Sequence, residues 1–243
     1  MIPAWQERTG MLLGEEGLQR LARSRVAVVG LGGVGAMAAE MIARAGVGHM
    51  ILVDADTVSE SNINRQLPAL RSTVGQYKCD VVRTRLMDIN PALEIQCIKE
   101  FLCEENIPQL LGSLELDCLV DCIDTLSPKI ALVQHCLSSG VHLVSSMGSG
   151  SKRDATRVRV DDISRTIQCP LARMLRKRLH KLGIDTGFTA VYSTERPDKS
   201  SVVIEETRNK KSQTGTVSYM PAVFGCVCAQ AALMHIVSVE DNS

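Results

Sequence analysis

Aromatic residues are scarce in this 243-residue sequence, and its charges cancel. Only 3% of the residues are aromatic, so a nucleic-acid surface built from stacked rings is not expected. Lysine and arginine together number 27, as do aspartate and glutamate, so the formal net charge is zero. A uniformly basic coat for nucleic acid is therefore excluded, although a local basic patch is not.

Long apolar runs are also missing. No run reaches the roughly 18 residues that a membrane-spanning helix needs. The longest candidate, 222–237, is interrupted by Gly225, Gln230 and His235. The N-terminal residues MIPAWQERTG lack the basic region and apolar segment of a secretory signal. We therefore expect a cytoplasmic protein that does not contact a membrane.

The nine cysteines do not form a metal-binding pattern. No pair has the C-x-x-C spacing of zinc ribbons and thiol redox sites. Cys226 and Cys228 are two positions apart, which is a poor spacing for sharing one tetrahedral metal ion. Cys118 and Cys122 lie in the apolar run DCLVDCID, where a reduced cysteine behaves as a small buried hydrophobic residue. We expect no zinc site.

The first two-thirds of the chain alternate between strand-like and helix-like segments. The expected strands are 25–29, 49–53, 93–98, 118–123 and 141–145, and the expected helices are 34–45, 75–89, 104–111 and 127–137. This alternation is typical of an α/β protein with a Rossmann-like, mostly parallel sheet and helices on both faces. A hydrophobic content of 45% is enough to fill such a core.

The composition changes after about residue 146. The segment 152–181 holds ten Lys or Arg against three Asp or Glu, a local balance of +7 that the neutral total conceals. Within it, 171–182 has one apolar helical face surrounded by basic residues. Residues 195–211 predict a polar loop or irregular hairpin, and 221–237 predict a buried final helix. We expect this part to form a smaller mixed region that completes the sheet.

A glycine-rich turn, GLGGVG at 30–35, joins the first expected strand to the first expected helix. In this context Gly30 can make the tight turn, Gly32 can leave a phosphate path open, and Gly35 lets helix and strand pack closely. Asp54 ends the second expected strand, near the spacing at which a carboxylate takes the ribose hydroxyls. These features predict nucleotide binding; a glycine turn without a ligand is the alternative.

Cationic residues follow this carboxylate. Arg65, in the run Asn64-Arg65-Gln66, and Lys78 suit the phosphates of a nucleoside triphosphate. Asp124 is expected at the carboxyl edge of the sheet, where it can hold Mg²⁺ against phosphate oxygens. No Walker A motif is present, so a P-loop ATPase is excluded. Each of these residues also has an alternative role without a ligand. Arg65 could be a solvated surface arginine, Lys78 an exposed helix residue, and Asp124 a helix cap.

The sequence resembles the ubiquitin-activating-type (ThiF/MoeB-like) adenylyltransferases in the order and spacing of its motifs. These motifs are GLGGVG (30–35), LVDADTVSESNINRQ (52–66), VGQYK (74–78), INP (89–91) and DCID (121–124). In that superfamily a substrate carboxylate attacks the α-phosphate of ATP, which gives an acyl-adenylate and pyrophosphate. The resemblance implies one adenylating domain over 1–243, with a nucleotide-binding part (1–146) and a substrate-binding part (147–243).

The same resemblance assigns roles by position. Asp54 would hold the ribose, and Arg65 and Lys78 the phosphates. Asp124 would hold Mg²⁺, and Arg8 matches an N-terminal arginine that the family's homodimers insert into the partner's ATP site. Catalytic roles are thus expected for Arg65, Lys78, Asp124 and Arg8. The expected ATP contacts are Gly30, Gly32, Gly33, Gly35, Asp54, Asn62, Asn64, Arg65, Gln66, Lys78, Asp124 and Thr125.

Further segments are similar to the tRNA threonylcarbamoyladenosine dehydratases, so that this resemblance covers nearly the whole chain. They are ERTGMLLGEEGL (7–18), the run from SSMGSG to RKRL (145–179), VYSTERP (191–197) and PAVFGCVCAQA (221–231). Those enzymes adenylate the carboxylate of a threonylcarbamoyl group on the adenosine next to the anticodon. A nitrogen of the same modification then closes a ring, with net loss of water. The basic segment suits such a substrate, with candidate tRNA contacts at Lys152, Arg153, Arg173, Arg176 and Lys177.

Several expectations stay open at this point. Cys169 precedes Pro170 at an expected helix start, where a thiol pKa could be lowered, so it is a candidate reactive thiol or a structural residue. Asp154-Ala155 replaces the Asp-Pro of many relatives, which leaves that turn less rigid. The segment after the last expected helix is short, so we expect no membrane-anchoring tail. A monovalent cation and a sulfur-transfer partner protein are further candidates.

Three other functions remain as alternatives. One is adenylation of the C-terminal glycine of a small sulfur-carrier or ubiquitin-like protein, although enzymes of that kind typically carry two C-x-x-C zinc pairs that this chain lacks. The second is a catalytically silent scaffold that binds ATP or RNA. The third is a nicotinamide-dependent oxidoreductase.

Overall fold

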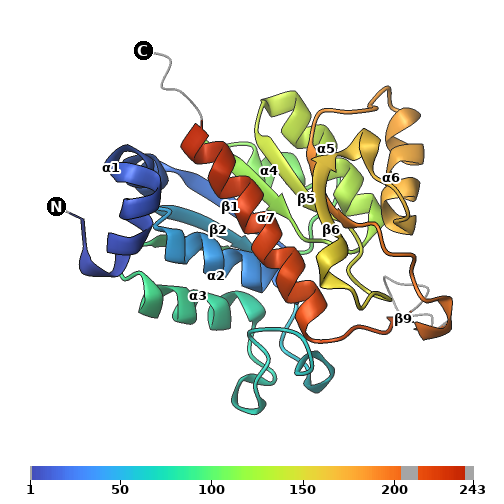
Figure 1. Ribbon diagram of the computed structural model, residues 1–243, viewed down its shortest axis with the longest axis horizontal. Helices are drawn as coiled ribbons and strands as arrows, with labels where there is room; N and C mark the ends of the chain where they lie inside the picture. The colour runs from blue at the N-terminus through green and yellow to red at the C-terminus, as the bar shows by residue number, and fades with distance from the viewer. Residues whose placement is uncertain (1, 204–212, 239–243) are drawn as a thin grey trace.

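The computed structural model describes residues 2–203 and 213–238, and its centre is a seven-stranded sheet (Figure 1). Its strands are β1 (Arg25–Val29), β2 (His49–Val53), β3 (Glu94–Ile98), β4 (Cys118–Asp121), β5 (His142–Ser146), β6 (Val158–Asp162) and β7 (Thr189–Ser193). They lie in the order β3-β2-β1-β4-β5-β7-β6, and all neighbours are parallel except β6 and β7. The Rossmann-like α/β fold and the mixed region that completes the sheet are thereby confirmed.

Helices cover both faces of this sheet. They are α1 (Glu7–Arg23), α2 (Gly35–Ala45), α3 (Lys78–Ile89), α4 (Ile107–Leu111), α5 (Leu126–Ser139), α6 (Pro170–His180) and α7 (Tyr219–Ser238). Successive residues of β1 point to opposite faces, so Val26 packs with α1, α2, α3 and α7, whereas Ala27 packs with α4, α5 and α6. Two apolar layers therefore enclose the central strands, as expected for a buried parallel sheet.

The final helix is a core element. Figure 1 shows α7 lying across the face of the sheet beside α2. Gly225 permits this close packing, because a Cβ there would lie 2.4 Å from the backbone oxygen of Val34. Among the described residues α7 is the one helix long and apolar enough to cross a membrane by length and composition, despite the interruptions noted in its sequence. In this fold 44% of its apolar window is buried.

Several expected boundaries are wrong by two or three residues; for example, the helix expected to end at 137 continues to Ser139, and the final helix begins at Tyr219 rather than at 221. The strand expected to reach residue 123 ends at Asp121, because the Asp121 carboxylate accepts a hydrogen bond from the Ile123 N–H at 3.0 Å and turns the chain. The helix expected from Gly75 begins at Lys78, since Gly75 has a φ of 87° and Tyr77 is extended. The helix expected from 104 begins at Ile107.

Other elements were not predicted at all. The helix α1 contains three glycines, and Gly14 has non-helical backbone angles (φ 75°, ψ 171°) at a kink, which obscures a helical pattern. Strands β6 and β7 pair within the mixed region. By contrast, the polar stretch was predicted as a loop or irregular hairpin, and its β8 (Val202–Val203) does pair with β9 (Gln213–Thr214) as a small hairpin. The remainder of the predicted polar stretch, 204–211, lies outside the described residues.

Candidate active site

The glycine-rich turn lies where the carboxyl ends of the parallel strands meet. The Gly30 N–H donates to the Val53 backbone oxygen at 2.8 Å, so the turn lies against the end of β2. Gly30 has a φ of 87°, and a Cβ on Gly35 would lie 1.7 Å from the Gly30 oxygen. Only glycine therefore permits this tight connection into α2. The first N–H groups of such a helix bind phosphate well, because they have no partner within the helix.

Asp54 lies against this turn. Its carboxylate accepts hydrogen bonds from the Leu31 N–H at 2.6 Å and from the Asp56 N–H at 2.8 Å. Burial raises the pKa of Asp54, while the nearby Lys78 charge and the two backbone donors oppose that rise. The carboxylate is thus part of the turn itself, at the position from which it can reach a ribose.

The two expected phosphate ligands differ in their surroundings. The Lys78 side chain is buried at the start of α3, and its Nζ lies 2.8 Å from an oxygen of the exposed Asp56. Arg65 is half-buried, and its guanidinium donates to the Ser61 backbone oxygen at 3.0 Å and to Asn64 Oδ1 at 2.7 Å. Asp56 was not predicted as a site residue, although its place two residues after Asp54 in DAD is a usable signal.

Buried polar atoms without a partner occur among the expected ATP contacts. In residues 2–203 and 213–238, three side-chain atoms are buried with no hydrogen-bond partner, and two of these are Gln66 Oε1 and Thr125 Oγ1. Such atoms are costly to leave unpaired, so a ligand is a physical reason for their presence. Thr125 precedes α5, and the exposed Asp124 lies just before it in the loop after β4. The residue set therefore fits a nucleotide.

Two other expected ATP contacts stabilise the loop between β2 and α3. Asn62 Oδ1 accepts a hydrogen bond from the Ser59 N–H at 3.2 Å, and the Asn64 amide donates to the Thr216 backbone oxygen at 3.1 Å. Both amides therefore hold the segment that carries Arg65. Gln66 Nε2 would lie 3.7 Å from a Cβ on Gly32, so this residue borders the turn.

A fully buried ion pair lies beneath the loop that carries Asp124. Lys129 Nζ donates to Asp121 Oδ2 at 2.6 Å, to Ser145 Oγ at 3.0 Å and to the Ser146 backbone oxygen at 2.9 Å. Both charged side chains are 0% exposed. This network joins the ends of β4 and β5 to α5, and it was not predicted. Its only sequence signal is an aspartate and a lysine eight positions apart in an apolar context.

A second charged cluster lies at the carboxyl end of β5. The Lys152 side chain is buried and donates to the Gly148 backbone oxygen. Burial lowers the pKa of Lys152, and the nearby Cys169 and Glu195 oppose this. Cys169 is 4% exposed at the residue before α6, so the candidate thiol is enclosed rather than open to solvent.

Comparison with known proteins identifies the family. The model of the ThiF family matches residues 7–243. The chain belongs to the ThiF family. It is 40% identical over 241 residues to the tRNA threonylcarbamoyladenosine dehydratase of Bacillus subtilis, covering 94% of this chain and 93% of the relative. The Escherichia coli enzyme of the same name is 35% identical over 256 residues, covering 97% and 95%.

The fold agrees with this family. The crystal structure of Escherichia coli tRNA N6-threonylcarbamoyladenosine dehydratase in complex with ATP superposes with a TM-score of 0.87 at 35% identity, covering 97% of this chain and 96% of that one. The resemblance inferred from the motifs is therefore confirmed. The roles of individual residues in this ThiF-family chain remain predictions.

Arg8 was predicted as a site residue, but it lies far from the glycine-rich turn of its own chain. It is exposed on α1, next to Gln6, whose side chain touches Gly46 at the far end of α2. The α2 helix has 11 residues, a length of about 16 Å. Within one ThiF-family chain Arg8 is thus at the opposite end of α2 from Gly35, so it does not reach the glycine-rich turn of its own chain.

The expected tRNA contacts are only partly available. Arg173 and Lys177 are exposed on α6, whereas Arg176 donates to the Thr166 backbone oxygen at 2.8 Å. Arg153 is exposed and pairs with Asp198 at 2.8 Å. The basic helix therefore presents some of its charges to solvent and uses others for its own packing.

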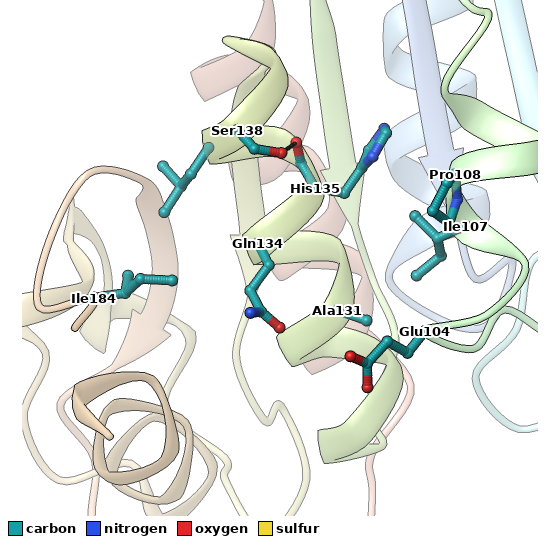
Figure 2. Close-up of a pocket in the computed structure, with 9 residues that line it drawn as sticks. Glu104, Ile107, Pro108, Ala131, Gln134, His135, Ser138 and Ile184 are labelled. Carbon is teal, nitrogen blue, oxygen red and sulfur yellow. Dashed lines mark hydrogen bonds between the residues drawn. The ribbon is translucent and has the colours of Figure 1, made fainter. Parts of the chain in front are cut away.

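A cavity of about 550 Å³ lies away from these residues, on the outer side of α5 (Figure 2). Figure 2 shows His135 and Gln134 of α5 lining it, with Ile107 of α4 and Ile184 at opposite ends. None of the predicted site residues lines this cavity. In the described part of the chain, no group of three His, Cys, Asp or Glu is arranged to hold a metal ion.

Proposed function

We propose that this protein is an ATP-dependent tRNA threonylcarbamoyladenosine dehydratase. It adenylates the carboxylate of N6-threonylcarbamoyladenosine next to the anticodon and promotes cyclisation with net loss of water. The observation that carries the proposal is similarity over 97% of the chain to a dehydratase solved with ATP. The buried, unpartnered oxygens of Gln66 and Thr125 support a nucleotide at the equivalent edge of this sheet. The carrier-protein alternative is not favoured, because the relatives matched over almost their full length are dehydratases.

The nucleotide-binding residues hold ATP so that its α-phosphorus is open to attack. The N–H groups that begin α2 bind phosphate oxygens, and Asp54 binds the ribose. Arg65 and Lys78 neutralise the phosphates, and for this Lys78 exchanges its exposed partner Asp56 for a phosphate oxygen. Asp124 would hold Mg²⁺ together with phosphate oxygens and waters, and the ion would supply positive charge against the pyrophosphate.

The substrate completes the reaction through its own atoms. A carboxylate oxygen forms a bond to the α-phosphorus as the bond to pyrophosphate breaks. A nitrogen of the same modification then attacks the acyl carbon, AMP leaves and a proton is lost. Because nucleophile and acyl group belong to one molecule, the enzyme mainly supplies orientation. Cys169 is not needed in this sequence of steps, and its burial agrees with a structural role.

The proposal includes a homodimer and a tRNA partner. Arg8 acts in the partner's ATP site, and the apolar side chains of Trp5, Met11 and Leu12 on and next to α1 are 45–84% exposed, as expected of a face covered by a second copy. Arg173 and Lys177 contact the tRNA backbone. A cytoplasmic location follows from this substrate. A monovalent cation and a sulfur-transfer partner protein remain proposals.

The decisive experiment measures the product nucleoside. Purified protein is incubated with ATP, Mg²⁺ and threonylcarbamoylated tRNA, and the digested nucleosides are weighed by mass spectrometry. We expect AMP to be released and the modified nucleoside to lose the mass of one water. No mass change with folded protein that binds ATP would refute the proposal. A thermal-shift comparison of ATP with NAD separates it from an oxidoreductase, since only the bound nucleotide raises the melting temperature.

A further inference from the structure

A second cavity lies at the same edge of the sheet as the glycine-rich turn. Its volume is about 460 Å³, which is within the range of small-molecule sites. Three segments line it, namely 151–153 after β5, the turn at 198–201 and the segment 215–218 that leads into α7, and Asn64 completes the wall. Figure 1 shows the chain between β9 and α7 passing along this side of the molecule.

The cavity shares a wall with the expected phosphate site. The Asn64 amide donates to the backbone oxygen of Thr216, and both residues line the cavity. On the other side of this wall, a Cβ on Gly33 would lie 3.0 Å from the Arg65 backbone oxygen and 2.8 Å from Pro221. A ligand in the cavity can therefore place one end beside a triphosphate bound at the glycine-rich turn.

The lining combines hydroxyl groups, the ion pair of Arg153 with Asp198 at 2.8 Å, and one buried lysine. Ser151 and Ser201 line the cavity and are hydrogen-bonded at 2.7 Å. Lys152 is 4% exposed, and its ammonium donates to the neutral carbonyl of Gly148. The nearby Glu195 carboxylate accepts hydrogen bonds from the Arg153 and Asp154 N–H groups at 2.8–3.1 Å. A buried ammonium with no salt-bridge partner within 4 Å among the described residues, whose neighbour Glu195 is engaged in this way, favours an incoming anion.

The burial of Lys152 determines whether it can contact a backbone phosphate or a smaller anionic group. The phosphates of a tRNA backbone remain on the outside of the complex and are reached by exposed side chains. A lysine that is 4% exposed can instead contact a small group that enters the cavity. The earlier expectation of a backbone contact at Lys152 is therefore replaced by a contact inside the cavity.

We propose that this cavity binds the threonylcarbamoyl side chain of the modified adenosine, with the Lys152 ammonium against its carboxylate. This inference rests on the proposed function. The hydroxyls of Ser151 and Ser201 bind the polar atoms of the same side chain. The shared wall at Asn64 places that carboxylate next to the nucleotide. Lys152 thus distinguishes modified from unmodified tRNA.

The test compares the dissociation constants of two tRNAs without ATP. One carries the threonylcarbamoyl group and the other is the same tRNA lacking it. We expect the protein to bind the modified tRNA about 10- to 100-fold more tightly, as is usual for a charge-assisted hydrogen bond. Lys152→Met should abolish this preference and leave the affinity for unmodified tRNA unchanged. Lys99→Met, an exposed lysine remote from the cavity, should keep the preference.

A second variant keeps the test decisive if Lys152→Met fails to fold. Ser218 is an exposed residue of the cavity lining, so Ser218→Trp should occlude the cavity without disturbing the core and should also remove the preference. Equal binding of both tRNAs by the unaltered protein, or a retained preference in either folded variant, would overturn the inference. Dehydration by the unaltered protein is scored separately, so failure of the proposed function is recognised independently.

Discussion

Replacing Lys129 by methionine should strongly destabilise the protein. Lys129 and Asp121 are both 0% exposed, and Lys129→Met leaves the Asp121 carboxylate buried with only the Ser145 hydroxyl and the Ile123 N–H as donors. Removing one partner of a buried ion pair costs about 3–5 kcal/mol. In a domain of this size each kcal/mol lowers the melting temperature by about 2–4 °C, so a fall of about 6–20 °C is expected.

The assay is thermal unfolding of Lys129→Met, Asp121→Leu and the double variant. The double variant removes both charges and should lose less stability than the sum of the single variants, by about 1–3 kcal/mol. Lys99→Met is the matched control. It breaks the exposed pair with Asp80, which lies at 2.7 Å, and should barely change the melting temperature.

Two results would refute this reasoning. If Lys129→Met melted within about 2 °C of the unaltered protein, the buried carboxylate would have found another counter-charge or a proton at little cost. If the single effects simply added, the two residues would not act as a pair.

Three further predictions follow from the structure. Arg65→Ala should lower the turnover number about 100- to 1000-fold in steady-state assays while ATP affinity, from calorimetry, changes less, since its charge is needed most as the phosphate bond breaks. Burial, reinforced by the His235 ring stacked at 3.5 Å, lowers the pKa of His142 to about 4 from 6.5, so the unfolded chain takes up a proton that the folded chain excludes. Stability should therefore fall as the pH drops from about 6.5 to 4, and urea unfolding of His142→Gln should show a flatter pH dependence. Gly225→Val should cost about 1–3 kcal/mol in thermal melts by forcing α7 away from α2, whereas Cys226→Val on the exposed side of α7 should not.

The sequence predicted those features that depend on neighbouring residues. The strand at 25–29, the turn at 30–35 and the helix after it were found at their predicted places to within one residue, because hydrophobic periodicity and glycine sterics act over a few positions. The kinked α1 was missed, since Gly14 interrupts its pattern. Strand β6 was missed because VRVDD carries three charges in five residues, and only Val158 and Val160 form its apolar alternation.

Some residues of the candidate site were likewise predicted from the sequence, and others were found only in the structure. Residues close to a motif, such as Asp54 beside the glycine-rich turn, were predicted from spacing. Asp121 and Lys129 were not, because their spacing of eight positions in DCIDTLSPK is too weak a signal to show that both charges lie under the sheet edge. Lys152 was predicted as a tRNA contact from local charge alone, and its burial was visible only in the fold.

The alternation of strands and helices over 25–145 and the glycine-rich turn were thus contained in the sequence itself, since short-range sterics and apolar spacing specify them. The family was contained there too, in the order and spacing of the motifs. The tertiary structure alone decided which charges are buried, which polar atoms lack partners and which segments enclose a cavity. These properties depend on surfaces contributed by residues far apart in the chain, such as Asn64 and Thr216, and the free energy of a charge is set by what covers it.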